Sequence, residues 1–153
     1  MLEENTKVVD FTLDDQDGNK WTLSENLDKT IILYFYPKDN TPGCTTQACT
    51  YRDFSDDFAK YNAKVVGISA DTVASHEKFI AKQSLNFTLL SDPEREVIKY
   101  FGAYGEKNMF GKKVMGIIRS SFIINQDGLI EKVFKRASPK KNAQEIIDYF
   151  ERK

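Results

Sequence analysis

The chain has 153 residues, of which 41% are hydrophobic, 22 are basic and 23 are acidic, and its formal net charge at pH 7 is -1. This length predicts one domain spanning residues 1–153, with enough apolar side chains for a core that needs no disulfide. The balanced charge gives no reason to expect nucleic acid or an anionic membrane as a partner.

The first residues, MLEENTKVVD, are polar and acidic, so we expect neither a secretory signal nor a transit sequence. No apolar stretch approaches the roughly 20 residues that a membrane-spanning helix needs. We therefore expect a soluble, cytoplasmic protein. In that compartment a permanent disulfide is unfavourable, so neighbouring cysteines point to catalysis, redox chemistry or metal binding.

The N-terminal part predicts a β-hairpin followed by a buried strand. Residues 8–13 alternate between apolar and polar side chains, Asp17-Gly18 predicts a turn, and the letters WTL predict the returning strand. Residues 30–36, TIILYFY, are continuously apolar and predict a strand covered on both faces.

A helix is predicted from residue 42 to about residue 61, because large side chains recur there at helical spacing. These are Gln47, Tyr51, Phe54, Phe58 and Tyr61. Strands are then predicted at residues 64–69 and 87–92, and helices at 71–84 and 92–102. Asp71 or Thr72 would cap the first of these helices, and Pro93 would lie in the first turn of the second.

The last third predicts a loop, a second hairpin and a helix. We expect residues 103–116 to form a loop whose basic part, 107–113, is solvated. Residues 119–125 and 129–135 predict two strands joined by a turn. Ser138 would cap the final helix, with Pro139 at its first position.

This order of elements predicts an α/β protein with a thioredoxin-like fold: a central mixed β-sheet flanked by helices, with an N-terminal β-hairpin extension. Reactive sites in such sheets gather at the C-terminal ends of strands, where helices begin. Cys44 lies just beyond the predicted strand 30–36.

Cys44 and Cys49 are the only cysteines of the chain. With Thr41 as N-cap and Pro42 as the first helical residue, Cys44 falls in the first turn, where unpaired N–H groups and the helix dipole favour a thiolate. Thr41 could turn its hydroxyl to the sulfur or to a bound substrate, and Gly43 leaves room for a ligand to approach the backbone.

The spacing of the two cysteines prevents a disulfide in an intact helix. Residues five apart in a helix have α-carbons about 8–9 Å apart, whereas a disulfide needs about 4.4–6.8 Å. Pairing would require the first turns to unwind. Two alternatives remain: a pair of small buried hydrophobic side chains, or metal binding, for which two thiols provide too few ligands.

Two further residues bear on a cysteine site. We expect His76, the only histidine, to lie on an exposed helix face and not to act as a base. Arg119 begins the strand 119–125, so a neighbouring strand could present it beside Cys44. A solvated arginine at a strand start is the alternative.

The segment PKDNTPGCTTQAC makes a family resemblance specific. Pro37, Thr41 and Cys44 match the P-x-x-x-T-x-x-C pattern of peroxiredoxins, and Cys49 resembles that of the bacterioferritin comigratory protein, or peroxiredoxin Q, branch. The resemblance covers essentially the whole chain, through SADTVASHEKF, FTLLSDPE, GEKNMFGKKVMGIIRSSFIINQDG and SPKKNAQEII. Two departures are Gln47, where the family often carries Glu, and Ser121, where Thr is commoner.

The resemblance implies a thiol-dependent peroxidase that reduces hydrogen peroxide and organic hydroperoxides. Cys44 would attack the peroxide and become a sulfenic acid, and Cys49 would condense with it to an intramolecular disulfide. Thr41 and Arg119 would hold the peroxide and the thiolate, and Pro37 would shield the pocket. Thioredoxin or a similar dithiol protein would reduce the disulfide. No cofactor or metal is implied, and the branch suggests a monomer.

Two other classes of function remain to be tested. A disulfide reductase or isomerase shares the expected fold, but this chain lacks its Cys-x-x-Cys motif. A non-catalytic holdase or interaction domain would need neither cysteine.

Overall fold

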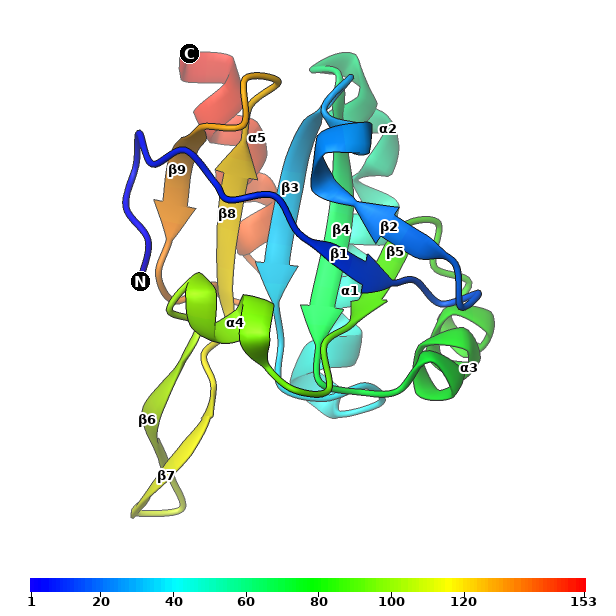
Figure 1. Ribbon diagram of the computed structural model, residues 1–153, viewed down its shortest axis with the longest axis vertical. Helices are drawn as coiled ribbons and strands as arrows, with labels where there is room; N and C mark the ends of the chain where they lie inside the picture. Colours follow the sequence, from blue (N-terminus) through cyan, green and yellow to red (C-terminus); the bar gives the residue numbers. More distant parts are fainter.

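The computed structural model describes all residues, 1–153. A seven-stranded sheet forms its centre, with strand order β2-β1-β5-β4-β3-β8-β9 (Figure 1). The strands are β1 (Thr12–Asp14), β2 (Lys20–Thr22), β3 (Thr30–Phe35), β4 (Ala63–Ser69), β5 (Thr88–Ser91), β8 (Ser120–Ile124) and β9 (Ile130–Phe134). Strands β3, β4 and β5 are parallel, and β8 runs antiparallel to β3.

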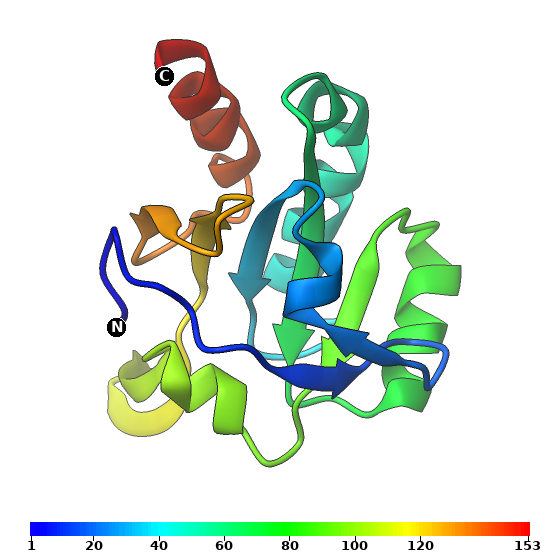
Figure 2. The same cartoon turned by 45° about the horizontal axis from the view of Figure 1, so that its top comes forward.

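Helices cover both faces of this sheet. They are α1 (Pro42–Asp53), α2 (Ser55–Lys60), α3 (Val73–Gln83), α4 (Glu96–Tyr100) and α5 (Asn142–Arg152), with a short 3-10 helix η1 (Leu23–Asn26). Helices α1, α2 and α5 lie behind the sheet in Figure 1, whereas α4 lies in front. Figure 2 shows the N-terminal segment crossing the face on which α4 lies.

Strand β3 is the centre of the core. Alternate side chains of a strand point to opposite faces. Accordingly, Ile31, Leu33 and Phe35 pack into one cluster of buried residues. Ile32 and Tyr34 pack, with Tyr36 just beyond the strand, into a second cluster against α1, α2, α3 and α5. The predicted strand with two covered faces is confirmed.

The connections give the thioredoxin-like fold. The unit β3-α1-β4 is a parallel crossover, and the unit β8-β9-α5 is an antiparallel hairpin followed by a helix. The β1–β2 hairpin extends the sheet at its other edge, with Gly18 in the left-handed conformation (φ 80°) that its turn requires. The expected fold class and both predicted hairpins are confirmed. None of the helices combines the length and apolarity that crossing a bilayer requires.

Several predicted boundaries were wrong. The helix expected over residues 42–61 is interrupted at Phe54, and α4 is shorter than expected because Arg95 takes a left-handed conformation (φ 60°). The final helix begins at Asn142, not at Pro139, after a turn in which the Asn142 N–H donates to the Ser138 carbonyl. The first strand begins at Thr12, not at residue 8.

The largest error concerns residues 103–116, which form a hairpin and not a solvated loop. Strands β6 (Tyr104–Met109) and β7 (Lys112–Ile117) pair antiparallel and project from the sheet (Figure 1). Phe110 and Gly111 occupy its turn with φ of 53° and 79°. Two consecutive positive φ angles are typical of a tight hairpin turn, but the pair Phe-Gly is not among its usual sequence signals.

Candidate active site

Cys44 occupies the first turn of α1, as the sequence predicts. Pro42 is the first residue of the helix, and Thr41 precedes it with the extended backbone of an N-cap (φ -88°, ψ 153°). The Thr41 hydroxyl does not cap the helix; it donates to the Lys38 carbonyl at 2.8 Å. Its oxygen lone pairs therefore remain available to accept a hydrogen bond from a ligand.

Arg119 lies directly beside Cys44. Its Nη1 donates to the Cys44 sulfur at 3.5 Å and to the Gln47 side-chain oxygen at 2.8 Å. The antiparallel register explains this placement, because Phe35 pairs with Ser120 and Arg119 therefore lies at the C-terminal end of β3. Cys44 is 1% exposed, so a cation and the positive end of a helix act on its sulfur in a site largely shielded from water.

The absence of a side chain at Gly43 makes room for Arg119 and not for a ligand. A Cβ atom at this position would lie 3.1 Å from Arg119 Nη2 and 3.8 Å from Pro139 Cγ. The sequence predicts that Gly43 leaves room for a ligand. In the structure, the guanidinium of Arg119 occupies that room. Glycine permits the cation to approach the start of α1 closely.

A buried polar network extends from Arg119 to α5. The Gln47 amide donates to the Tyr51 hydroxyl at 3.2 Å, and both Tyr51 and Ser121 donate to the Asn142 side-chain oxygen. Burial raises the pKa of Tyr51 to about 12, so this hydroxyl stays neutral. A glutamine accepts from the arginine and donates to the tyrosine at once, which an ionised glutamate cannot do. The two departures from the family pattern, Gln47 and Ser121, belong to one network.

His76 is buried, contrary to the expectation of a surface histidine. Its Nδ1 lies 2.8 Å from an Asp39 carboxylate oxygen, and its Nε2 lies 2.9 Å from the Leu90 carbonyl oxygen. Both ring nitrogens therefore lie within hydrogen-bond distance of oxygen atoms inside the protein. The sequence signal for this burial is the spacing of His76 and Phe79. The two residues are three apart and therefore share the inner face of α3.

Asp39 is the hub of this second network. Its carboxylate accepts hydrogen bonds from Tyr36 and Ser75, and its N–H donates to the Asp71 carboxylate at 2.9 Å. Asp39, Asp71 and His76 bring three potential metal-ligand atoms within 4.8 Å of one another. Each of these side chains already has hydrogen-bond partners within the protein, so the cluster fits an anchor for the loop before α1 better than a metal centre.

The Tyr34 hydroxyl is buried and has no hydrogen-bond partner in the protein. Its ring packs between those of Tyr36 and Tyr51, with centroids 5.2 Å and 4.7 Å away. Burial is the main cause that raises its pKa far above the ordinary value, and the charge of Cys44 contributes. An unsatisfied buried hydroxyl costs about 1–3 kcal/mol.

We therefore expect Tyr34→Phe to stabilise the reduced protein by about 1–3 kcal/mol, since the unpartnered hydroxyl disappears while the ring remains. In a chain of this size that corresponds to roughly 2–4 °C in Tm per kcal/mol. Differential scanning calorimetry on the reduced protein measures it. The matched control is Tyr36→Phe, which removes a hydroxyl that donates to Asp39 at 2.6 Å and should lower Tm. A lower Tm for Tyr34→Phe would show that its hydroxyl is satisfied.

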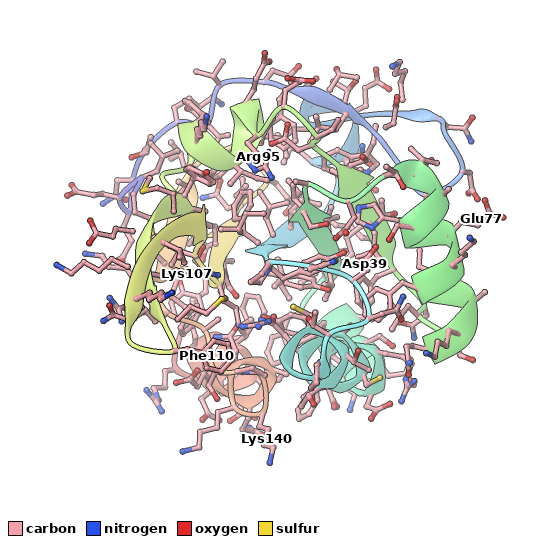
Figure 3. The ribbon with its side chains drawn as sticks, turned by 90° about the horizontal axis from the view of Figure 1, so that it is seen from below. Asp39, Glu77, Arg95, Lys107, Phe110 and Lys140 are labelled. Atoms are coloured by element: carbon pink, nitrogen blue, oxygen red, sulfur yellow. The ribbon has the colours of Figure 1, made fainter.

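A groove of about 1080 Å³ reaches the site from the side of the β6–β7 hairpin. Pro37, half-buried, and Arg119 both line it, and Arg119 also contacts the Cys44 sulfur. Its charged lining is mainly basic: Lys107, Lys113, Arg119, Lys135 and Arg136, against Glu3 and Glu106. Figure 3 views the molecule from this side, with Lys107 on the hairpin and Asp39 beyond the end of β3.

Cys49 lies on α1, half-buried, and its sulfur donates to the Gln83 side-chain oxygen of α3 at 3.5 Å. Both cysteines are free thiols, and α1 is intact around them. As the sequence predicts, an unbroken helix keeps the two sulfurs from pairing. The site therefore contains a shielded thiol beside a cation and a second thiol that only a conformational change can bring to it. These are the features of thiol-dependent redox enzymes with a thioredoxin-like fold.

Comparisons with known proteins define the family. The AhpC/TSA family model matches residues 5–133. Peroxiredoxin Bcp of Escherichia coli is 48% identical over 124 residues, which cover 81% of this chain and 80% of that protein. A crystal structure of a cysteine-to-serine variant of Xylella fastidiosa peroxiredoxin Q matches with a TM-score of 0.92 and 31% identity, covering 99% of this chain and 97% of the other.

A third relative is a Xanthomonas campestris bacterioferritin comigratory protein, studied for its alkyl peroxide reduction activity. It matches with a TM-score of 0.86 and 34% identity over 93% of this chain and 90% of that one. The chain belongs to the AhpC/TSA family and is a peroxiredoxin, a thiol-dependent peroxidase. The resemblance found in the sequence is confirmed.

Proposed function

We propose that Cys44 is the peroxidatic cysteine, and the contact between its sulfur and Arg119 is the observation that carries this assignment. The thiolate attacks the terminal peroxide oxygen, the O–O bond breaks, and Cys44 becomes a sulfenic acid. Negative charge develops on the leaving oxygen, so a guanidinium fixed beside the sulfur lowers the barrier in a site shielded from water.

Thr41 and Pro37 complete the proposed pocket. The Thr41 hydroxyl oxygen has lone pairs free to accept the terminal O–H of a hydroperoxide, because its own proton is donated to Lys38. Pro37 lines the same groove as Arg119, and its proposed role is to limit water access to the thiolate. The alkyl peroxide activity studied in the Xanthomonas relative supports organic hydroperoxides as substrates alongside hydrogen peroxide.

Cys49 is the proposed resolving cysteine. After oxidation, the first turns of α1 unwind, the sulfenic acid of Cys44 meets the Cys49 thiol, and an intramolecular disulfide forms with loss of water. The partial exposure of Cys49 fits this role, because a partner protein needs access to at least one sulfur of the disulfide.

Thioredoxin is the proposed reductant, and a thiol pair that must be reduced after every turnover suits the cytoplasm. We further propose that residues 1–153 act as one domain and as a monomer, since a single chain supplies every group of the site. Light scattering at micromolar concentration tests the monomer; a stable dimer would contradict it.

The proposed function is tested by coupling peroxide consumption to NADPH oxidation through thioredoxin and its reductase. Mass spectrometry of the oxidised chain should find Cys44 and Cys49 in one intramolecular disulfide. Turnover of insulin disulfides without peroxide consumption would instead favour a disulfide reductase.

Arg119→Met should slow the reaction of reduced enzyme with peroxide by about 10²–10³-fold, the usual effect of losing one fixed donor at a developing charge. Stopped-flow tryptophan fluorescence, or competition with a reporter peroxidase, measures the rate. Arg119→Lys keeps the positive charge but loses the planar guanidinium, which contacts both the Cys44 sulfur and the Gln47 side-chain oxygen. This variant should therefore recover only part of the rate. A loss smaller than about threefold for Arg119→Met would remove the arginine from the mechanism.

A further inference from the structure

The Lys107 side chain, on β6, extends across the neighbouring strand β7. Its ammonium donates to the Ile117 carbonyl oxygen at 2.9 Å, and its Cε lies only 3.0 Å from where a Cβ of Gly116 would be. The glycine thus lets the lysine stem cross β7. Lys112, on the opposite strand of the same hairpin, is exposed and makes no such contact. In Figure 3 the Lys107 side chain lies on the inner side of the hairpin.

Lys107 lines the same groove as Pro37 and Arg119. One of its protons goes to Ile117, and the other two have no partner in the protein. Burial lowers the pKa of Lys107, Arg119 lowers it further, and the charge of Cys44 opposes both effects. The lysine is therefore electrostatically coupled to both groups of the peroxide site.

Cleavage of the peroxide O–O bond requires a proton donor for the leaving oxygen, and none of the other groups described near Cys44 can provide that proton. Breaking the O–O bond releases an alkoxide or hydroxide, which must gain a proton to leave as alcohol or water. Arg119 does not release a proton near neutral pH, and the Thr41 hydroxyl proton is donated to Lys38. Both nitrogens of His76 are engaged within the Asp39 network.

We propose that Lys107 is the proton donor to the leaving oxygen, an assignment that rests on the proposed peroxidatic role of Cys44. The thiolate sulfur of Cys44 bonds to the terminal oxygen and the O–O bond breaks. The departing oxygen takes a proton from the Lys107 ammonium. Thiolate, hydroperoxide and ammonium become sulfenic acid, alcohol and neutral amine, and the amine regains its proton from solvent.

The test varies the leaving group. Reduced wild-type and Lys107→Met enzymes are reacted in a single turnover with tert-butyl hydroperoxide, hydrogen peroxide and peracetic acid. Loss of a general acid costs about 10²-fold or more when the leaving group is strongly basic. We expect that loss with tert-butyl hydroperoxide and hydrogen peroxide, but a change within about threefold for peracetic acid, whose leaving acetate needs no proton. An equal loss on all three oxidants would overturn the proposal.

Two variants sharpen the result. Lys112→Met changes the same residue type on the same hairpin and should leave all three rates unchanged; a matching loss there would show that the hairpin itself was disturbed. Lys107→Arg keeps the charge but cannot give up a proton readily, so full recovery of rate would overturn proton donation. If wild-type enzyme fails to form a sulfenic acid at Cys44, the proposed function fails; if only the dependence on leaving group is missing, this inference alone fails.

Discussion

Cys44→Ser will abolish peroxidase activity, with a fall of at least about 10³-fold, since losing the nucleophile removes most of an enzyme's rate enhancement. A serine hydroxyl is neutral at physiological pH and cannot form a sulfenic acid. Serine is nearly the same size as cysteine, so α1 should keep its first turn and its contacts with Arg119. The NADPH-coupled assay measures the loss, and circular dichroism checks the fold.

This prediction also separates the enzyme from a non-catalytic role. A holdase or interaction domain would not depend on the Cys44 thiol, so its function would survive the substitution. In a single turnover Cys49→Ser is the matched control, because it removes the other thiol of the same helix and should still consume about one equivalent of peroxide. Retention of more than a tenth of the peroxidase rate in Cys44→Ser would contradict the assigned nucleophile.

Cys49→Ser will permit one turnover and then stop cycling with thioredoxin. The enzyme should consume about one equivalent of peroxide per chain, since Arg119 and α1 are unchanged at Cys44. Without a second thiol no intramolecular disulfide forms, and a dithiol protein has no disulfide to attack. Rapid-quench measurement of peroxide gives the stoichiometry, and a sulfenic-acid trap followed by mass spectrometry locates the product at Cys44.

One result would contradict the prediction for Cys49→Ser. Undiminished steady-state turnover with thioredoxin would mean that the reductant attacks the sulfenic acid directly and that Cys49 is not the resolving residue. A small thiol such as dithiothreitol serves as control, because it can reduce an exposed sulfenic acid without Cys49.

The sequence predicts those parts of the fold that depend on local pattern. Continuous apolar character identifies β3, and the Asp-Gly turns identify both hairpins of the sheet. Thr72 caps α3 as predicted, with its side chain accepting from the Ser75 N–H at 3.1 Å. The first turn of α1 is also predictable, because Thr, Pro and Gly before Cys44 are local signals of a helix start.

The missed features depend on contacts between distant segments. His76 is buried because α3 brings it onto Asp39 and Leu90, and a polar ring in an otherwise mixed helix gave no local sign of those partners. Lys107 lines the groove, with its side chain packed across Gly116 of β7, a contact that depends on the pairing of β6 and β7. The network through Tyr51 and Asn142 depends on where α5 begins, which the sequence placed three residues too early.

Asp39 fixes how far the reactive sulfur can travel. Its bonds to Tyr36, Ser75, His76 and Asp71 fasten the chain five residues before Cys44. Five fully extended residues span at most about 17 Å. In any conformation of the oxidised segment, the Cys44 α-carbon therefore stays within this distance of Asp39, as long as the hydrogen bonds of Asp39 are kept. The disulfide proposed between Cys44 and Cys49 must therefore form within a short segment of chain that is tethered at Asp39.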